Sequence, residues 1–194
     1  METLVMKETL QAMLQIAGQE MVSKGLETVV NTENKYLRDL KINLGNALQY
    51  QTLSKKESYL LALSVAINEK NKLAIESFTK LAMNEGSTEA EIAETYACVS
   101  LLNANNVLYR FRHFTKKDVY QNSPAGIKMS IMMSPVFGKE FFELMSLAVS
   151  ALNGCELCVN AHEASLLKLG TSENRIFDAI KLTAIVRSFT AIQF

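Results

Sequence analysis

Apolar residues recur every three or four positions along most of the chain, which is the spacing of amphipathic helices. The chain also has only 2 prolines and 8 glycines, and no Asn-Gly hairpin between alternating apolar runs. The predicted helices cover residues 1–24, 32–47, 54–68, 71–84, 88–108, 139–152, 155–169 and 172–194. Two of them open on capping boxes, Ser54 with Glu57 and Thr88 with Glu91. The pattern therefore predicts an all-α protein.

The helical pattern is interrupted at residues 113–138, which contain both prolines, Pro124 and Pro135. We interpret this segment as a linker between two helical parts. The preceding part includes residues 1–24, which we treat as a helical extension of a domain covering residues 25–194.

The parts before and after this linker resemble each other. Residues 64–102 align beneath residues 149–186, with one residue inserted in the middle of the alignment. The matches are Asn68 with Asn153, Leu81 with Leu166, Gly86 with Gly170, Glu89 with Glu173 and Ile92 with Ile176. Each part has the order helix, tight break, helix, Gly-Ser/Thr turn, helix. The chain is thus predicted to duplicate a three-helix unit, over about residues 54–110 and 139–194.

Charge and composition narrow the classes of function. The 20 basic residues balance the 20 acidic ones, which argues against nucleic acid or an anionic membrane as the main partner. No apolar run is long enough to span a membrane, and the N-terminal segment lacks the apolar block of a signal peptide. We therefore expect a cytoplasmic protein. In that compartment a CxxC pair is catalytic or binds metal more often than it forms a structural disulfide.

Two of the three cysteines and one of the two histidines lie close together in the stretch CELCVNAH. Cys155, Cys158 and His162 are spaced so that they share one face of a helix. An Asn-Gly pair just before them predicts a turn between two antiparallel helices. At 1.5 Å per residue, Glu143 lies roughly 15 Å before that turn and His162 roughly 12 Å after it. We expect the carboxylate and the imidazole to come level, with Cys158 nearer the turn and Cys155 at the surface.

The first half lacks this cluster. In the alignment, the positions of Cys155, Cys158 and His162 hold other residue types, and Glu143 faces a serine. The aligned residues are Lys70, Leu73, Ser77 and Ser58. Because the scaffold is built without the cluster in one half, we interpret the cluster as functional rather than as packing.

The chemistry of these residue types allows two hypotheses. An imidazole and a helix N-terminus both favour the thiolate, a carboxylate fixes the tautomer of the histidine, and a second thiol converts a sulfenic acid to a disulfide. The same CxxCxxxH face could instead hold zinc, with Glu143 as the fourth ligand.

Three other features are interpreted as structural. Cys98 falls on an apolar stripe and is expected in the core. Residues 109–117, YRFRHFTKK, are basic and aromatic, but in a neutral chain they are expected to be a solvated helix end. Met129, Met132 and Met133 are expected to fill the core or an interface.

SALNGCELCVNAHEASLLKLG followed by NRIFDAIKLTAIV closely resembles the active-site signature of the AhpD-like alkylhydroperoxidases, within the carboxymuconolactone decarboxylase superfamily. The segments LRDLKINLGN, NNVLYRFRHF, GIKMSIMMSP and FELMSLAVSALNGC resemble the same family. The resemblance covers about residue 25 to the end. It implies an all-α fold with an internal duplication, assembled as a homotrimer.

The resemblance also implies roles for the cluster. Cys158 would be the peroxidatic thiol and Cys155 the resolving thiol, with His162 and Glu143 as the proton relay. No cofactor would be bound, and electrons would come from the dihydrolipoyl group of an acyltransferase component. The family pattern often has a second histidine where this chain has Leu157, and we expect this departure to affect the rate and the choice of electron donor.

The sequence thus predicts an antioxidant alkyl hydroperoxidase that could also regenerate a peroxiredoxin of the alkyl hydroperoxide reductase C type. The enzymatic alternative is a general thiol-disulfide oxidoreductase of the same superfamily. The alternative from another class is a zinc-stabilised helical oligomer without enzymatic activity.

Overall fold

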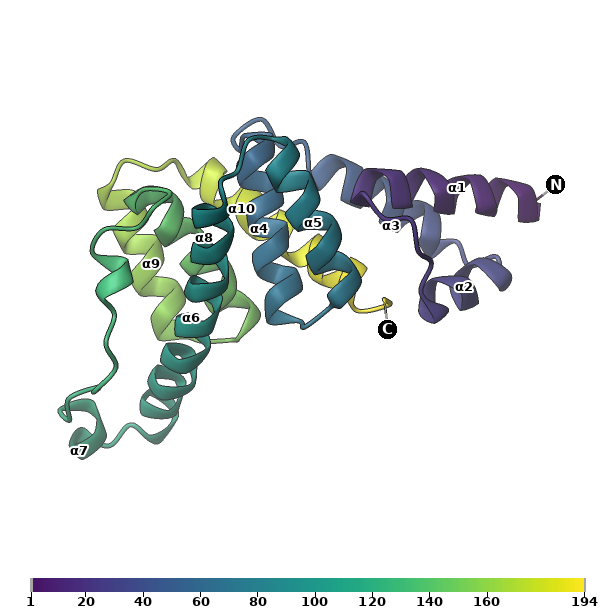
Figure 1. The fold of residues 1–194 in the computed structure, drawn as a ribbon. Helices are drawn as coiled ribbons and strands as arrows, with labels where there is room; N and C mark the ends of the chain where they lie inside the picture. The colour runs from purple at the N-terminus through teal and green to yellow at the C-terminus, as the bar shows by residue number, and fades with distance from the viewer. Residues whose placement is uncertain (1, 194) are drawn as a thin grey trace.

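The computed structural model describes residues 2–193, and within that range it contains ten α-helices, one short 3-10 helix and no strand (Figure 1). The prediction of an all-α fold is confirmed. The helices are α1 Glu2–Ala17, α2 Lys24–Asn31, α3 Tyr36–Ala47, α4 Lys55–Asn68, α5 Lys72–Asn84, α6 Glu89–Thr115, α7 Asp118–Gln121, η1 Ser130–Met132, α8 Lys139–Leu152, α9 Glu156–Lys168 and α10 Glu173–Thr190.

Both predicted capping boxes are present. The Ser54 hydroxyl accepts from the backbone N–H of Glu57 at the start of α4, and the Glu57 carboxylate accepts from the backbone N–H of Ser54. Thr88 and Glu91 make the same reciprocal pair at the start of α6. Each pair satisfies two backbone donors that a helix N-terminus leaves without partners.

The N-terminal helices differ from the prediction. The expected helix over residues 1–24 ends at Ala17, because Gly18 adopts a positive φ of 65°. A new helix then begins at Lys24, where the Ser23 hydroxyl caps the backbone N–H of Leu26. Helix α1 packs against α3, which in turn packs against α10 (Figure 1). This packing buries Met6 and Met13 of α1 completely or nearly so.

The linker segment is shorter and more structured than predicted. Helix α6 continues to Thr115, where Lys116 takes a left-handed conformation with φ 51° and its N–H bonds to the carbonyl of Arg112. The short helices α7 and η1 follow within the segment. In Figure 1 the chain from α7 returns alongside α9 before it enters α8.

The predicted internal duplication is present, but with a simpler register. Helices α4 and α8 both have 14 residues, and α5 and α9 both have 13. The equivalent helices start at Lys55 and Lys139, Lys72 and Glu156, and Glu89 and Glu173, each pair 84 positions apart. The turns match as well, since Lys70 with φ 56° corresponds to Gly154 with φ 65°. No inserted residue is needed, so the alignment of Asn68 with Asn153 was wrong by one position.

The corrected register changes which residues of the first half are equivalent to the residues of the cysteine cluster. The equivalents of Glu143, Cys155, Cys158 and His162 are Tyr59, Asn71, Ala74 and Phe78. Helix α5 buries Ala74, Phe78 and Ala82 at the positions where α9 buries Cys158, His162 and Leu166. The conclusion that the first half lacks the cluster therefore holds, and its equivalent positions on α5 are core positions.

One ion pair occurs in both halves with its charges exchanged. Lys56 Nζ lies 2.7 Å from Glu91 Oε1 in the first half. At the equivalent positions of the second half, Glu140 Oε1 lies 3.0 Å from Arg175 Nε. Both halves thus keep an ion pair between the first and third helix of the unit. The positive charge lies on the first helix in one half and on the third helix in the other.

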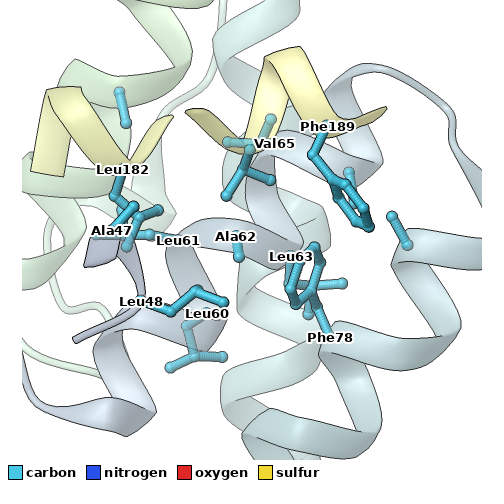
Figure 2. Close-up of a cluster of buried hydrophobic side chains, with 14 of the residues drawn as sticks. Ala47, Leu48, Leu60, Leu61, Ala62, Leu63, Val65, Phe78, Leu182 and Phe189 are labelled. Carbon is cyan, nitrogen blue, oxygen red and sulfur yellow. The ribbon is translucent and has the colours of Figure 1, made fainter. Parts of the chain in front are cut away.

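The core lies along α4 and α8, which run through the centre of the molecule. Residues 60–66 of α4 and residues 141–150 of α8 are buried without interruption. Figure 2 shows the α4 part of this core, in which Leu61 and Leu63 lie with Phe78 of α5 and Phe189 of α10. Within residues 2–193 no helix has the length and apolar character needed to cross a bilayer.

Candidate active site

The turn between α8 and α9 brings the candidate residues together. Gly154 takes the positive φ that reverses the chain, and Cys155 follows as the N-cap residue of α9. The Asn153 side chain donates to Asn106 Oδ1 and accepts from Asn68, at 2.9 and 3.2 Å. The Arg110 guanidinium donates to the Asn153 carbonyl. The turn is therefore tied to α6 and α4.

Cys155 and Cys158 are joined by a disulfide in the structure, with their Cα atoms 5.3 Å apart. Their depths differ from the prediction. Cys155, expected at the surface, is 0% exposed, whereas Cys158 is 7% exposed and borders a pocket. The prediction failed because it assumed that proximity to the turn means proximity to solvent. The Asn153–Asn106 contact instead holds this turn against α6.

Glu143 and His162 come level across the helix pair, as predicted. His162 Nδ1 lies 2.6 Å from Glu143 Oε2, and both side chains are buried. Burial alone would raise the pKa of the Glu143 carboxyl, but the hydrogen bonds from His162 and Lys139 outweigh it and lower the pKa. Because the carboxylate is ionised and accepts, Nδ1 is the donor, which leaves Nε2 of His162 for proton exchange.

Lys139 is a member of this group that the sequence analysis missed. Its Nζ lies 2.7 Å from Glu143 Oε1 and donates to the Met132 carbonyl at 3.0 Å. Lys139 therefore ties η1 to the buried carboxylate. The Lys–Glu spacing of i, i+4 on the predicted helix could have identified it.

A pocket of about 350 Å³ opens beside Cys158 and His162. Its walls come from α6, α9 and the segment around η1, and it is lined by Leu102, Asn105, Tyr109, Met129, Met132, Leu157, Cys158, Ala161 and His162. Met129 and Met132, predicted to fill the core or an interface, line this pocket, and Met132 also packs against the core as predicted. Met133 is 85% exposed. Nothing in the sequence pattern distinguished these methionines, because the pocket depends on the path of a segment without regular periodicity.

The interpretation of Cys98 as a core residue is confirmed, whereas residues 109–117 form a helix end that is only partly solvated, because Arg112 is buried. Cys98 is fully buried, its Sγ lies 3.7 Å from Ser146 Oγ, and burial raises the pKa of its thiol to about 12. In the basic stretch, Arg110 and Arg112 donate to the backbone carbonyls of Asn153 and Ser123. These arginines therefore hold loops of the same chain.

The zinc hypothesis finds no support in the side-chain arrangement. Over residues 2–193, no three His, Cys, Asp or Glu side chains are arranged to bind a metal ion. In this state the two sulfur atoms are bonded to each other, and Glu143 is paired with His162 and Lys139.

The chain combines an internally duplicated helical fold with two thiols, a histidine and a carboxylate at one turn. Comparison with known proteins assigns this combination to a family. Residues 129–193 match the carboxymuconolactone decarboxylase family. The chain is 36% identical over 170 residues to the alkyl hydroperoxide reductase AhpD of Coxiella burnetii, covering 86% of this chain and 96% of that protein.

Two further relatives carry the same name. The AhpD of Methylocella silvestris is 35% identical over 153 residues, covering 79% of this chain and 85% of that protein. The AhpD of Solibacter usitatus is 34% identical over 167 residues, covering 86% and 94%. The chain belongs to the AhpD family of alkyl hydroperoxide reductases.

Proposed function

We propose that this protein reduces organic hydroperoxides through a dithiol–disulfide cycle of Cys158 and Cys155. The observation that carries the proposal is the position of the disulfide-bonded pair beside the Glu143–His162 hydrogen bond, at the wall of a pocket. Membership of the AhpD family supports the same reaction class.

The cycle begins with both cysteines reduced. Cys158 lies in the first turn of α9, where the helix dipole favours a thiolate, and His162 one turn further on accepts its proton. The thiolate attacks the terminal oxygen of the hydroperoxide, so that an S–O bond forms as the O–O bond breaks. The leaving alkoxide takes the proton from His162 and departs as an alcohol. Glu143 keeps the ring in the tautomer that this transfer needs and stabilises the imidazolium.

Cys155 then resolves the sulfenic acid formed on Cys158. Its sulfur attacks that of Cys158, the S–S bond forms, and the hydroxyl leaves as water after taking up a proton. In sum, one hydroperoxide and two thiols become one alcohol, one water and one disulfide. The role of resolving thiol suits Cys155 because it is fully buried and within disulfide distance of Cys158, whereas only Cys158 borders the pocket.

Reduction of the disulfide requires a thiol donor, and we propose the dihydrolipoyl group of an acyltransferase component, as the family resemblance implies. The resemblance also supports a homotrimer and regeneration of a peroxiredoxin of the alkyl hydroperoxide reductase C type. Large exposed apolar side chains on α6 and α10, such as Phe114 at 70% and Phe177 at 63%, are consistent with an assembly that covers them.

Leu157 is the departure from the family pattern, and it lies on the pocket wall with 39% of its surface exposed. Where the family often has a histidine, this chain presents an apolar side chain. The proton relay proposed for this protein therefore runs through His162, Glu143 and Lys139 alone.

The test is peroxide consumption with dihydrolipoamide and with other thiols as donors. Turnover that is faster with dihydrolipoamide than with monothiols supports the proposed donor. Thiol-disulfide exchange without peroxide consumption would instead identify a general oxidoreductase. Zinc at one per chain, removable by a chelator, would identify the non-enzymatic alternative.

A further inference from the structure

The pocket beside Cys158 contains two polar side chains that the proposed cycle does not use, Asn105 and Tyr109, and Asn105 is the more buried of the two. Asn105 is 5% exposed and lies on α6 across from Cys158 and His162. Among the residues that the structure describes, its Oδ1 has no hydrogen-bond partner. Its Nδ2 donates to the thioether sulfur of Met129, at 3.2 Å, and a thioether is a weak acceptor.

An unsatisfied amide in a buried position is costly, so its retention in a pocket calls for an explanation. The neighbouring Asn106 shows what a structural asparagine looks like in the same helix. Its Nδ2 donates to Ser150 Oγ at 3.0 Å and its Oδ1 accepts from Asn153 at 2.9 Å. Asn106 is satisfied by the protein, whereas Asn105 is not.

The duplication supplies a second comparison. In the register of 84 positions, Asn105 corresponds to Phe189 and His162 corresponds to Phe78. Both phenylalanines are fully buried and belong to the cluster in Figure 2. The location formed by α5 and α10 thus places two aromatic rings in the core, where the equivalent location formed by α9 and α6 places an imidazole and an amide beside a pocket.

The pocket chemistry suits an organic hydroperoxide. A hydroperoxide group is both a donor and an acceptor, and it matches the two atoms of an amide that lack strong partners. The other walls include the apolar side chains of Leu102, Met132 and Leu157, which suit a hydrocarbon group.

We propose that Asn105 binds the hydroperoxide group of the substrate, accepting from its O–H and donating to its oxygen in place of the Met129 sulfur, and that the apolar walls select bulky organic hydroperoxides over hydrogen peroxide. The inference rests on the proposed function. It adds a residue that orients the terminal oxygen toward Cys158 and a physical cause for a preference among peroxides.

The test uses the reduced full-length protein in single-turnover reactions with cumene hydroperoxide and with hydrogen peroxide. Asn105→Leu, close in size but without polar atoms, should slow disulfide formation with both peroxides by about tenfold, the factor expected for one lost hydrogen bond. Oxidation of the same variant by diamide, which needs no peroxide binding, should be unchanged. Asn106→Ala, which loosens the turn that carries the cysteines, is the control for a structural effect: it should lower thermal stability and change the peroxide and diamide reactions alike.

A second variant separates the two parts of the proposal. Wild type should react faster with cumene hydroperoxide than with hydrogen peroxide, because only the former buries apolar surface. Met132→Ala should narrow that preference several-fold, because it should slow the reaction with cumene hydroperoxide more than the reaction with hydrogen peroxide.

The outcomes are distinguishable. Wild type that consumes no peroxide contradicts the proposed function itself. Active wild type with an equally fast Asn105→Leu variant overturns the inference alone, as does a variant slowed equally with diamide. A variant slowed only in its reduction by dihydrolipoamide would assign the pocket to the electron donor and overturn the inference as well.

Discussion

His162 Nδ1 lies 2.6 Å from Glu143 Oε2, although the two residues are nineteen positions apart on different helices. The contact exists because α8 and α9 run antiparallel from the turn at Gly154, so that residues about equally far from it come level. The buried carboxylate fixes the histidine tautomer with Nε2 free. This relationship is the basis for the proton transfers in the proposed cycle.

We expect His162→Gln to slow the peroxide step by roughly 10²–10⁴, the usual contribution of a positioned acid–base group. Single-turnover kinetics of the reduced protein measure this step directly. The chain offers a matched control in its other histidine. His113 is half-buried and its Nε2 lies 3.3 Å from Glu156, so His113→Gln should leave the rate unchanged. Equal effects of the two substitutions would refute the assigned role.

The cysteine substitutions separate the proposed roles. Cys158→Ser should abolish peroxide consumption, because the attacking sulfur is lost. The Cys155→Ser variant should consume one equivalent of peroxide per chain and then stop, because Cys158 is left as a sulfenic acid. A dimedone probe should trap this sulfenic acid. Cys98→Ser, at a buried thiol outside the pocket, should cycle normally. If Cys155→Ser blocked the first turnover while Cys158→Ser allowed it, the two roles would be exchanged.

Much of the candidate site could be predicted from the sequence, because it depends on helix periodicity. The level pairing of Glu143 and His162 follows from their distances to one turn. The depth of Cys155 could not be predicted, since it depends on side chains of α6 that hold the turn. The same is true of the pocket, which is formed partly by Met129 and Met132 in an aperiodic segment. The predicted register of the duplication was wrong by one position, because it matched Asn68 with Asn153 on the ground that they are identical. The equivalent positions of the two turns are instead marked by the positive φ of Lys70 and Gly154.

The lowered pKa of Glu143 predicts a pH dependence of stability. Because the folded-state pKa lies below the ordinary value, the ionised carboxylate stabilises the fold above about pH 4.5. This stabilisation is lost as the pH falls through the lowered pKa. The gap in unfolding free energy between wild type and Glu143→Gln should therefore be constant from neutral pH down to that range and shrink below it.

Urea denaturation at a series of pH values measures this gap, with the exposed Glu8→Gln as the control that should show almost none. If the difference in unfolding free energy stayed the same at pH values well below the ordinary pKa of glutamate, ionisation of Glu143 would contribute nothing to stability, which would contradict the prediction.

Phe78 should contribute strongly to stability, because it is fully buried in the half that lacks the cysteine cluster. Phe78→Ala is expected to cost about 3–5 kcal/mol of unfolding free energy, from lost burial and the cavity that remains. Val119→Ala, at a position of α7 that is 65% exposed, is the control and should cost far less. Chemical denaturation of both variants in the reduced state makes the comparison, and similar costs would contradict the packing described for α5.

The central claim is that the Cys155–Cys158 pair reduces hydroperoxides. It is tested most directly by mixing the reduced protein with a stoichiometric amount of cumene hydroperoxide, without any donor. We predict one alcohol formed per chain, loss of two free thiols, a mass decrease of two hydrogens in the peptide that contains both cysteines, and renewed turnover on addition of dihydrolipoamide. A reduced protein that leaves the peroxide intact and keeps its thiols would contradict the account.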